Sequence, residues 1–491
     1  MGTQEIVRRL GLALVVAGSL WSWTAQAEDR DDAIFGEETP AAAATSTTAA
    51  AQPAASKAEA AADPSDLGDA RITGPAKENT ELLTRDRTQI GGFFYTRTTG
   101  SLGEGQKISD AGLGNTTLFE SYFDSRINDR LRVYTRGRLI YNPLADVPSS
   151  MASIPGYSTT AANTDEVRAV LTQMWVKFDL NQRVFVTAGR QFVRWGATRF
   201  WNPVDVLNSA KYNPLLFFDD RVGPTMIKFH IPIESLGWNF YALALTENAA
   251  KAEQLGLAVR GEFVFGPVEM GLTGLARKGF DPKAGFDVSA GVGDFDLTGE
   301  VSAWLPNKGS TNLGTQQGVA SSGYGDPQWY ASAGASWSWA YREDDSLTLG
   351  AEYFHNPQGQ TADAVVRAQV DAALQGKTAP AMTPLYTGKD YMGLLAAVTS
   401  PGSFSDAAIT AMGLTNLTDK SGTAQLSLSN RFLTDLTVEV YGAISWGTGE
   451  FRGYIPRLKD AMTQLTPVFA SFAEQLHAPL FRGGMNLRID L

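Results

Sequence analysis

Hydrophobic and polar residues alternate along most of the chain after residue 86. One clear example lies near the C-terminal end, where the apolar positions are Leu436, Val438, Val440, Ile444 and Trp446. The segment 479–491 repeats the alternation up to its last residue, Leu491. A period of two residues is typical of strands with one apolar and one polar face. The pattern therefore predicts an all-β fold.

The alternation divides into separate segments, each of which predicts a strand. They are 88–98, 115–127, 130–142, 167–180, 182–194, 223–233, 236–247, 254–266, 268–279, 284–292, 294–305, 328–340, 345–356, 388–399, 405–417, 422–432, 435–447 and 479–491. Most run for about 10 residues or more, the length that a tilted strand needs to cross a bilayer. Strands of soluble proteins average about 5–6 residues. The segment 405–417 has the weakest pattern.

Short turns alternate with long loops between these segments. The short turns include 128–129, 181–182, 235–236, 266–267 and 434–435, and the long loops include 143–166, 195–222, 306–327, 357–387 and 448–478. Bacterial outer-membrane barrels have short periplasmic turns, long external loops and an even number of strands. The chain is therefore predicted to be a transmembrane antiparallel β-barrel of about 18 strands, with 16 as the alternative and both termini periplasmic. Outward aromatic residues near strand ends, among them Tyr141, Trp329, Trp337, Trp339 and Trp446, suit interfacial girdles.

The first part of the chain has a different character. Arg8 and Arg9 precede an apolar run and the small-residue sequence Ala25-Gln26-Ala27, which predicts a cleavable signal peptide over residues 1–27. Residues 28–86 are rich in Ala, Thr and Pro and are expected to form a disordered periplasmic linker. The barrel is expected over 87–491, in the cell outer membrane. Because 28–86 is too biased in composition to fold as a compact plug, the sequence favours passive transport.

The composition argues against several kinds of functional site. The chain has no cysteine and three histidines, His230, His355 and His477, so no thiolate metal site, disulfide or cofactor site is expected. The surroundings of the histidines match no catalytic motif, and the chain is not expected to be an enzyme. A net charge of -11 argues against a nucleic-acid partner.

Two neighbouring predicted strands carry charges of opposite sign on the face that would line the lumen. The positions are Arg132, Arg136 and Arg138 on one strand, and Glu120 and Asp124 on the other. One interpretation is a pore lining that sets selectivity for small solutes. The other is a salt-bridge ladder whose neighbouring charges neutralise one another at close range.

The loop 195–222 is the third on the long-loop side, after 99–114 and 143–166. It carries the most distinctive stretch, WGATRFWNPVDVLN from Trp195 to Asn208. It resembles the W-G-x-x-x-F-W-N-P-x-D-x-L-N signature of a mostly uncharacterised family of proteobacterial outer-membrane porin-like barrels. That family belongs to a wider group that includes alginate-export-type channels. The resemblance implies an outer-membrane barrel and assigns no substrate.

In general porins the third external loop folds inward and narrows the pore, and the resemblance implies the same place for this loop. The charged residues expected at such a constriction are Arg194, Arg199, Asp205, Asp219 and Asp220. The alternative is a loop packed over the rim, with Trp195 and Trp201 as its small core.

Two other long loops contain patterns typical of helices, over 361–376 and 457–476. We expect short helices in extracellular loops there, either covering the mouth of the barrel or packed on its rim.

The function that fits these features is a porin-like passive channel for small hydrophilic solutes, as a monomer or a trimer. Its expected partners are outer-membrane lipid, the barrel-assembly machinery and the solutes themselves. The alternatives are a structural or adhesive barrel closed by its own loops, and a polymer-export channel. Ionic conductance would separate the channel from a closed barrel.

Overall fold

The computed structural model describes residues 87–144, 166–208, 210–219, 221–305, 326–342, 345–375, 383–464 and 473–491. The expected signal peptide, the expected linker and Asp220 lie outside these residues.

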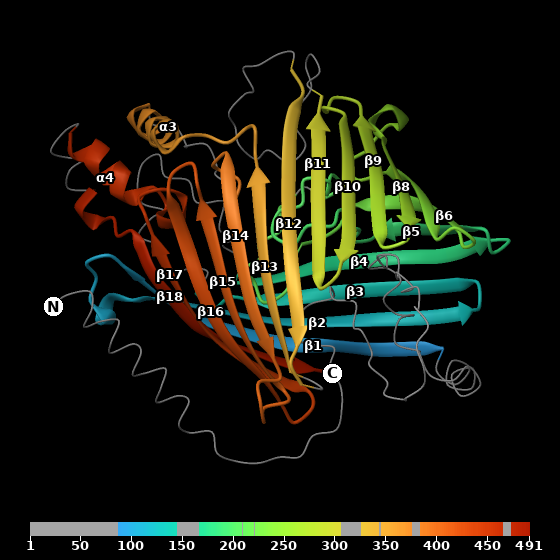
Figure 1. Cartoon of the computed structure of the whole chain (residues 1–491), viewed down its shortest axis with the longest axis horizontal. Helices are drawn as coiled ribbons and strands as arrows, with labels where there is room; N and C mark the ends of the chain where they lie inside the picture. Colours follow the sequence, from blue (N-terminus) through green and yellow to red (C-terminus); the bar gives the residue numbers. More distant parts are fainter. Residues whose placement is uncertain are drawn as a thin grey trace. The chain divides into compact units, whose positions relative to one another are not determined.

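The described chain forms one closed antiparallel sheet of 18 strands (Figure 1). The strands are β1 Thr88–Gly103, β2 Gly112–Asn128, β3 Leu131–Tyr141, β4 Val167–Leu180, β5 Val184–Arg190, β6 Thr225–Ile233, β7 Trp238–Leu245, β8 Gly256–Phe265, β9 Val268–Arg277, β10 Lys283–Val292, β11 Phe295–Trp304, β12 Gln328–Ala340, β13 Ser346–His355, β14 Asp390–Thr399, β15 Ala407–Asn416, β16 Ser421–Phe432, β17 Leu436–Trp446 and β18 Pro479–Asp490. Each strand pairs with the next in sequence, and β1 pairs with β18 to close the barrel. The predicted all-β barrel of 18 strands is confirmed.

The strand limits follow the predictions closely, with two informative differences. The weakest predicted segment, 405–417, forms β15. β1 extends to Gly103 because it continues to pair with β2 and β18 beyond residue 98. β5 is shorter than predicted: it follows a turn in which Asn181 and Gln182 have left-handed backbones, and it ends at Arg190, where the chain leaves the sheet.

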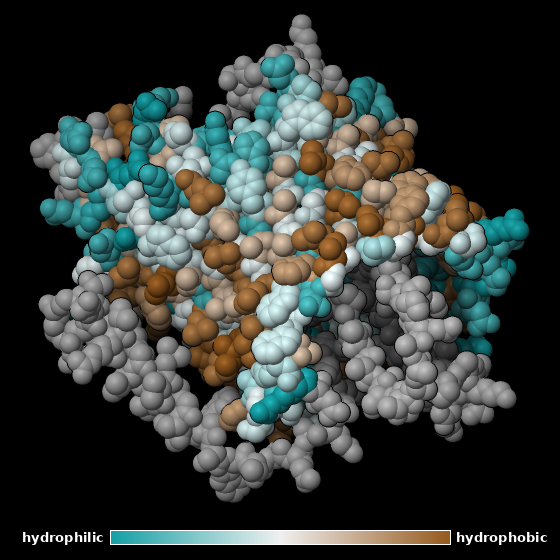
Figure 2. Space-filling model, in the orientation of Figure 1, coloured by the Kyte–Doolittle hydropathy of each residue, from teal (hydrophilic) through white to brown (hydrophobic). Residues whose placement is uncertain are grey.

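Lipid-facing positions are mostly apolar, and many of the alternate positions are polar. Outward residues include Phe119, Phe123, Leu139, Phe229 and Leu272, each more than a third exposed. Figure 2 shows such hydrophobic side chains gathered over the strands on the face it presents. In a bilayer every backbone N–H and C=O must be paired internally, which a closed barrel achieves. Among the described residues, no helix is long and apolar enough to span a membrane.

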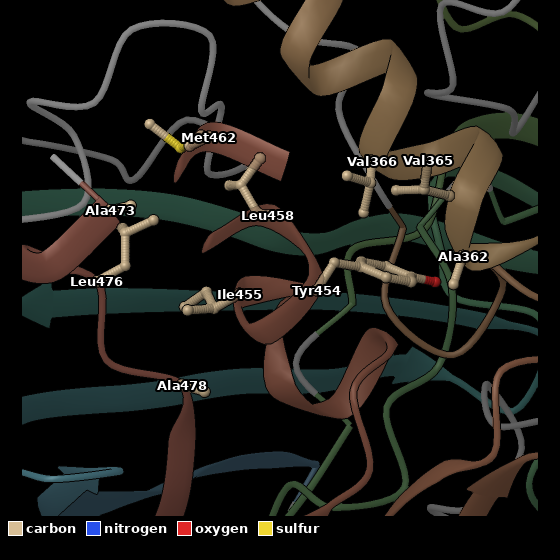
Figure 3. Packing of buried hydrophobic residues seen from close by; sticks show 10 residues of the cluster. All are labelled: Ala362, Val365, Val366, Tyr454, Ile455, Leu458, Met462, Ala473, Leu476 and Ala478. Carbon is tan, nitrogen blue, oxygen red and sulfur yellow. The ribbon is translucent and has the colours of Figure 1, made fainter. Parts of the chain in front are cut away.

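One end of the barrel carries the short turns and the other carries the long connections. Two helices, α3 Ala362–Leu374 and α4 Ile455–Thr463, lie at the long-loop end (Figure 1). Short 3-10 turns occur at Ile108–Asp110, Ala252–Gln254 and Glu450–Arg452. Val365 and Val366 of α3 pack with Tyr454, Ile455 and Leu458 of the last long loop (Figure 3). The described parts of the two loops therefore form one packed unit.

This unit is joined to the barrel through the carboxyl group of Glu450. Its oxygens accept hydrogen bonds from the Tyr391 hydroxyl at 2.6 Å, the Asn416 side-chain amide at 2.9 Å and the Leu385 N–H. The Glu450 N–H donates to Asp419 at 2.8 Å. Burial raises the pKa of Glu450 to about 7, and the nearby Asp419 adds to the shift.

Candidate functional site

The inward face of β1–β5, here called the basic wall, carries a cluster of arginines. Seven basic residues point inward in alternation with outward apolar ones: Arg97, Arg126, Arg132, Arg136, Arg138, Arg168 and Lys177. Three acidic residues share this wall: Glu120, Asp124 and Asp179. The wall therefore carries a net positive charge.

Cross-strand ion pairs order part of the basic wall. Glu120 is 1% exposed, accepts a hydrogen bond from Arg138 at 2.7 Å and forms an ion pair with Arg136 at 2.5 Å. Asp124 pairs with Arg132 at 2.7 Å. These five residues, which the sequence placed on one face, are brought together by the register of β2 and β3. Among them Arg136 is the most exposed, with 33% of its side chain accessible.

The inward face of β11–β17 has a different composition, and we call it the hydroxyl wall. Serine and threonine dominate its inward positions, for example Ser336, Ser338, Thr348, Thr423 and Ser427. Its inward acids include Glu300 on β11 and Glu352 on β13. The two glutamates are 2% and 4% exposed.

The connection 191–224, called loop L3 below, leaves β5 and packs against three sectors of the inner wall. Trp195 and Val204 pack with Met226, Leu243 and Ala258 of β6–β8. Further along, Phe200 and Trp201 pack on β11–β15, and Phe217 and Phe218 reach β1. These contacts come from strands all around the ring, so L3 crosses the lumen.

Backbone N–H groups of L3 bind the two glutamates of the hydroxyl wall. Glu300 accepts from the N–H groups of Ala197 at 2.6 Å, Thr198 at 2.7 Å and Val204 at 3.0 Å. Glu352 accepts from those of Arg199 at 2.7 Å, Phe200 at 3.0 Å and Trp201 at 2.8 Å. The Thr198 hydroxyl donates a further hydrogen bond to Glu300, and the Ser332 hydroxyl donates one to Glu352.

Aromatic packing holds the same part of the loop. Trp201 is fully buried, stacks on Phe354 with ring centroids 5.7 Å apart, and donates its indole N–H to the Leu385 carbonyl at 3.0 Å. The Phe200 ring lies over Gly393, where a Cβ would come within 2.5 Å of the ring. Trp195 and Trp201 are therefore core residues, but they pack on different sectors of the wall and form no separate small core.

Arg221 organises the second half of L3. It pairs with Asp205 at 2.9 Å and with Asp219 at 2.6 Å, so two predicted constriction residues share one guanidinium. Burial raises the pKa of Asp205, with Arg221 opposing the shift. Arg194 donates to the Thr198 carbonyl at 2.9 Å, and the side chain of Arg199 is exposed.

Phe217 and Phe218 bring L3 to the basic wall. Phe218 lies 5.6 Å from Phe93 and 5.1 Å from Tyr95, centroid to centroid. The guanidinium of Arg138 lies 5.5 Å from the Phe218 ring centroid, at cation–π distance. The loop thus contacts both the hydroxyl wall and the basic wall.

Sequence reasoning missed three residues of this arrangement: Glu300, Glu352 and Arg221. The alternation along β11 and β13 does place both glutamates on the inward face. A buried inward acid in a wall of hydroxyls is a signal that could have singled them out, because a buried carboxylate needs donors. Arg221 stands two residues after Asp219, within the loop that the sequence predicts to form the constriction.

Comparison with known proteins gives a limited result. No protein-family model matches the chain, and no curated protein matches it. Among solved structures, OccAB1 of Acinetobacter baumannii is similar at 10% identity, with a TM-score of 0.49, over 82% of this chain and 96% of that one. The outer-membrane protein opdK of Pseudomonas aeruginosa is similar at 10% identity, with a TM-score of 0.47, over 82% and 98%.

OccK2 (OpdF) of Pseudomonas aeruginosa, solved in complex with glucuronate, gives the same identity, TM-score and coverages as opdK. With every TM-score below 0.5, these similarities decide neither substrate nor mechanism. The class follows from the chain's own fold. A closed antiparallel barrel of 18 strands with an apolar outer face and a polar interior is an outer-membrane β-barrel, located in the outer membrane.

Proposed function

We propose that this barrel is a passive channel for small hydrophilic solutes and that it prefers anions. The observation that carries the proposal is a polar lumen with a net positive wall, crossed by one anchored loop. Barrels of 16–18 strands enclose an aqueous channel, whereas about 8 strands leave room only for side chains. A single crossing loop narrows such a lumen.

The preference for anions rests on charge. The basic wall has seven cationic and three anionic side chains at its inward positions. Rings or rows of one sign select ions by charge, and low-dielectric walls strengthen the effect. The hydroxyl wall offers neutral donors and acceptors that suit hydrated solutes.

Several predicted site residues enter this proposal. Arg132, Arg136, Arg138, Glu120 and Asp124 line the path on the basic wall. Arg194, Arg199, Asp205 and Asp219 belong to the constriction that L3 forms. In the cell, the long-loop end faces outward and both termini face the periplasm, following an export signal over 1–27.

The same proposal makes the chain a transporter of solutes and not an enzyme. Its partners are lipid, the assembly machinery and the solutes that pass. Charged lining residues of both signs fit small ions better than a polymer of a single sign.

Planar-bilayer recording tests the proposal. Purified barrel should give discrete conductance steps in KCl. A matched sample denatured before reconstitution should give none. Persistent silence of the folded protein at several voltages and salt concentrations would contradict the channel and favour a barrel closed by its loops.

A further inference from the structure

The inner part of L3 exposes backbone donors in an unusual arrangement. Between Ala197 and Val204, six N–H groups point at two carboxylates of the wall. The interruption falls at Asn202-Pro203, where proline has no N–H to offer. Successive N–H groups that converge in this way form anion-binding concavities.

The local backbone explains why these donors converge. Gly196 has φ +109°, a conformation that favours glycine, and a Cβ there would lie 2.4 Å from Glu300 Oε1. The Asn202 side chain accepts the Asp205 N–H at 3.2 Å and closes the turn that follows. The chain is therefore shaped around the carboxylates.

The wall presents those carboxylates in register. Glu300 on β11 lies opposite Ser332 of β12, and Ser332 donates its hydroxyl to Glu352 of β13 at 3.1 Å. The two glutamates thus lie on the strands on either side of β12, at adjacent inward positions along it. Six N–H groups and two hydroxyls satisfy them.

We propose that Glu300 and Glu352 are the positioning residues of the constriction: each is a built-in anion for one N–H concavity of L3, and together they hold the loop across the lumen. Hydrogen bonds to a charged acceptor are stronger than neutral ones, and removing a buried acceptor leaves several donors unsatisfied. The link to conduction rests on the proposed function, whereas the anchoring itself does not.

Chemical rescue tests the anchoring directly. In Glu300→Ala, amide exchange at Ala197, Thr198 and Val204 should accelerate by about tenfold or more, since bonds to charged acceptors are lost. Glu352→Ala should accelerate exchange at Arg199, Phe200 and Trp201. Added formate should slow exchange again by refilling the vacated anion position. Neutral formamide, of similar shape, should not.

Controls separate anchoring from general damage. Glu439→Ala removes another buried inward glutamate, which accepts a hydrogen bond from Asn486 on the neighbouring strand, and it leaves in place the two carboxylates that bind residues 197–204 of L3. Heat-resistant migration on gels reports an intact barrel. Should an alanine variant fail to fold, Glu300→Gln and Glu352→Gln keep the shape and remove the charge, with the same accelerations expected.

Single-channel conductance gives the functional arm. The double variant should conduct more than the wild type, because L3 no longer holds its place, and formate should lower the conductance again. Unchanged exchange in both single variants and the double variant would overturn the anchoring, as would equal rescue by formamide. A silent wild-type channel would instead reject the proposed function, while exchange would still decide the anchoring.

Discussion

The basic wall and the hydroxyl wall are built from the same kind of strand but use their buried carboxylates differently. On the basic wall, Glu120 pairs with arginines of the adjacent strand, 16 and 18 residues away in sequence. On the hydroxyl wall, Glu300 and Glu352 bind the backbone of a loop that is 96 to 153 residues away. The basic wall pairs its buried carboxylates with its own arginines, and the hydroxyl wall uses its buried carboxylates to position L3.

This difference assigns two tasks to two sides of one lumen. The basic wall keeps a net positive charge after its internal pairing, which suits selection among ions. The carboxylates of the hydroxyl wall bind neutral N–H and O–H groups, which do not cancel their charge. This wall therefore contributes a negative potential to the lumen, whereas the basic wall contributes a positive one. L3 joins the two, through Glu300 and Glu352 on one side and through Phe218 on the other.

The largest effect is expected at Glu120. Glu120→Ala leaves Arg136 and Arg138 without their shared carboxylate, and breaking a buried pair costs about 3–5 kcal/mol. The midpoint of guanidinium unfolding in detergent should fall accordingly, and anion preference should increase. Asp124→Asn is the matched control with a smaller loss, because Asp124 serves one arginine. Equal losses in both variants would contradict the central place of Glu120.

Trp201 tests the attachment of L3 to the hydroxyl wall. Trp201→Ala removes a fully buried ring stacked on Phe354 and should cost about 3 kcal/mol in the free energy of unfolding. Trp329→Ala is the control, since Trp329 faces outward and is 56% exposed. A larger loss for Trp329 would place the packing energy on the lipid face and not in L3.

The Glu450 junction should respond to pH. Its pKa is raised from 4.5 to about 7, so the folded cluster holds a proton that the open cluster releases. The stabilisation of the folded cluster is complete below the pKa that Glu450 has in the unfolded state, and it is lost as pH rises toward 7. Amide exchange at Leu385 is measured in the wild type and in Glu450→Gln at each pH. The ratio of the two rates should rise by up to about tenfold per pH unit between the unfolded and the folded pKa of Glu450. A ratio independent of pH would contradict the shift.

The smallest effect is expected for a single hydroxyl of the hydroxyl wall. Ser338 bonds Thr348 at 3.0 Å at an exposed position. Ser338→Ala should change stability by less than about 0.5 kcal/mol and leave ion selectivity unchanged. A selectivity shift as large as that of Arg136→Gln, measured in the same bilayers, would remove the functional distinction between the walls.

The strands were predictable because the membrane imposes its rule on each of them locally. An outward position meets lipid and an inward position meets water or polar groups, so alternation gives both the strand and its face. Even β15, whose pattern is weak, follows from the need for a partner between β14 and β16. The ion pairs of Glu120 follow in turn, because register on adjacent strands is local.

The anchors of L3 were not predictable in the same way. Alternation places Glu300 and Glu352 on the inner face, but it does not say which distant segment they bind. Their partners are backbone N–H groups, which carry no residue identity in the sequence. Arg221 is similar: only the folded loop brings Asp205, 16 residues earlier, beside it.

The reversal potential in a KCl gradient measures directly whether the basic wall selects anions. The wild type should give a sign that reports chloride over potassium, and Arg136→Gln and Arg168→Gln should each shift the potential toward zero. Potassium preference in the wild type, or no shift in either variant, would contradict a basic wall that selects the ions.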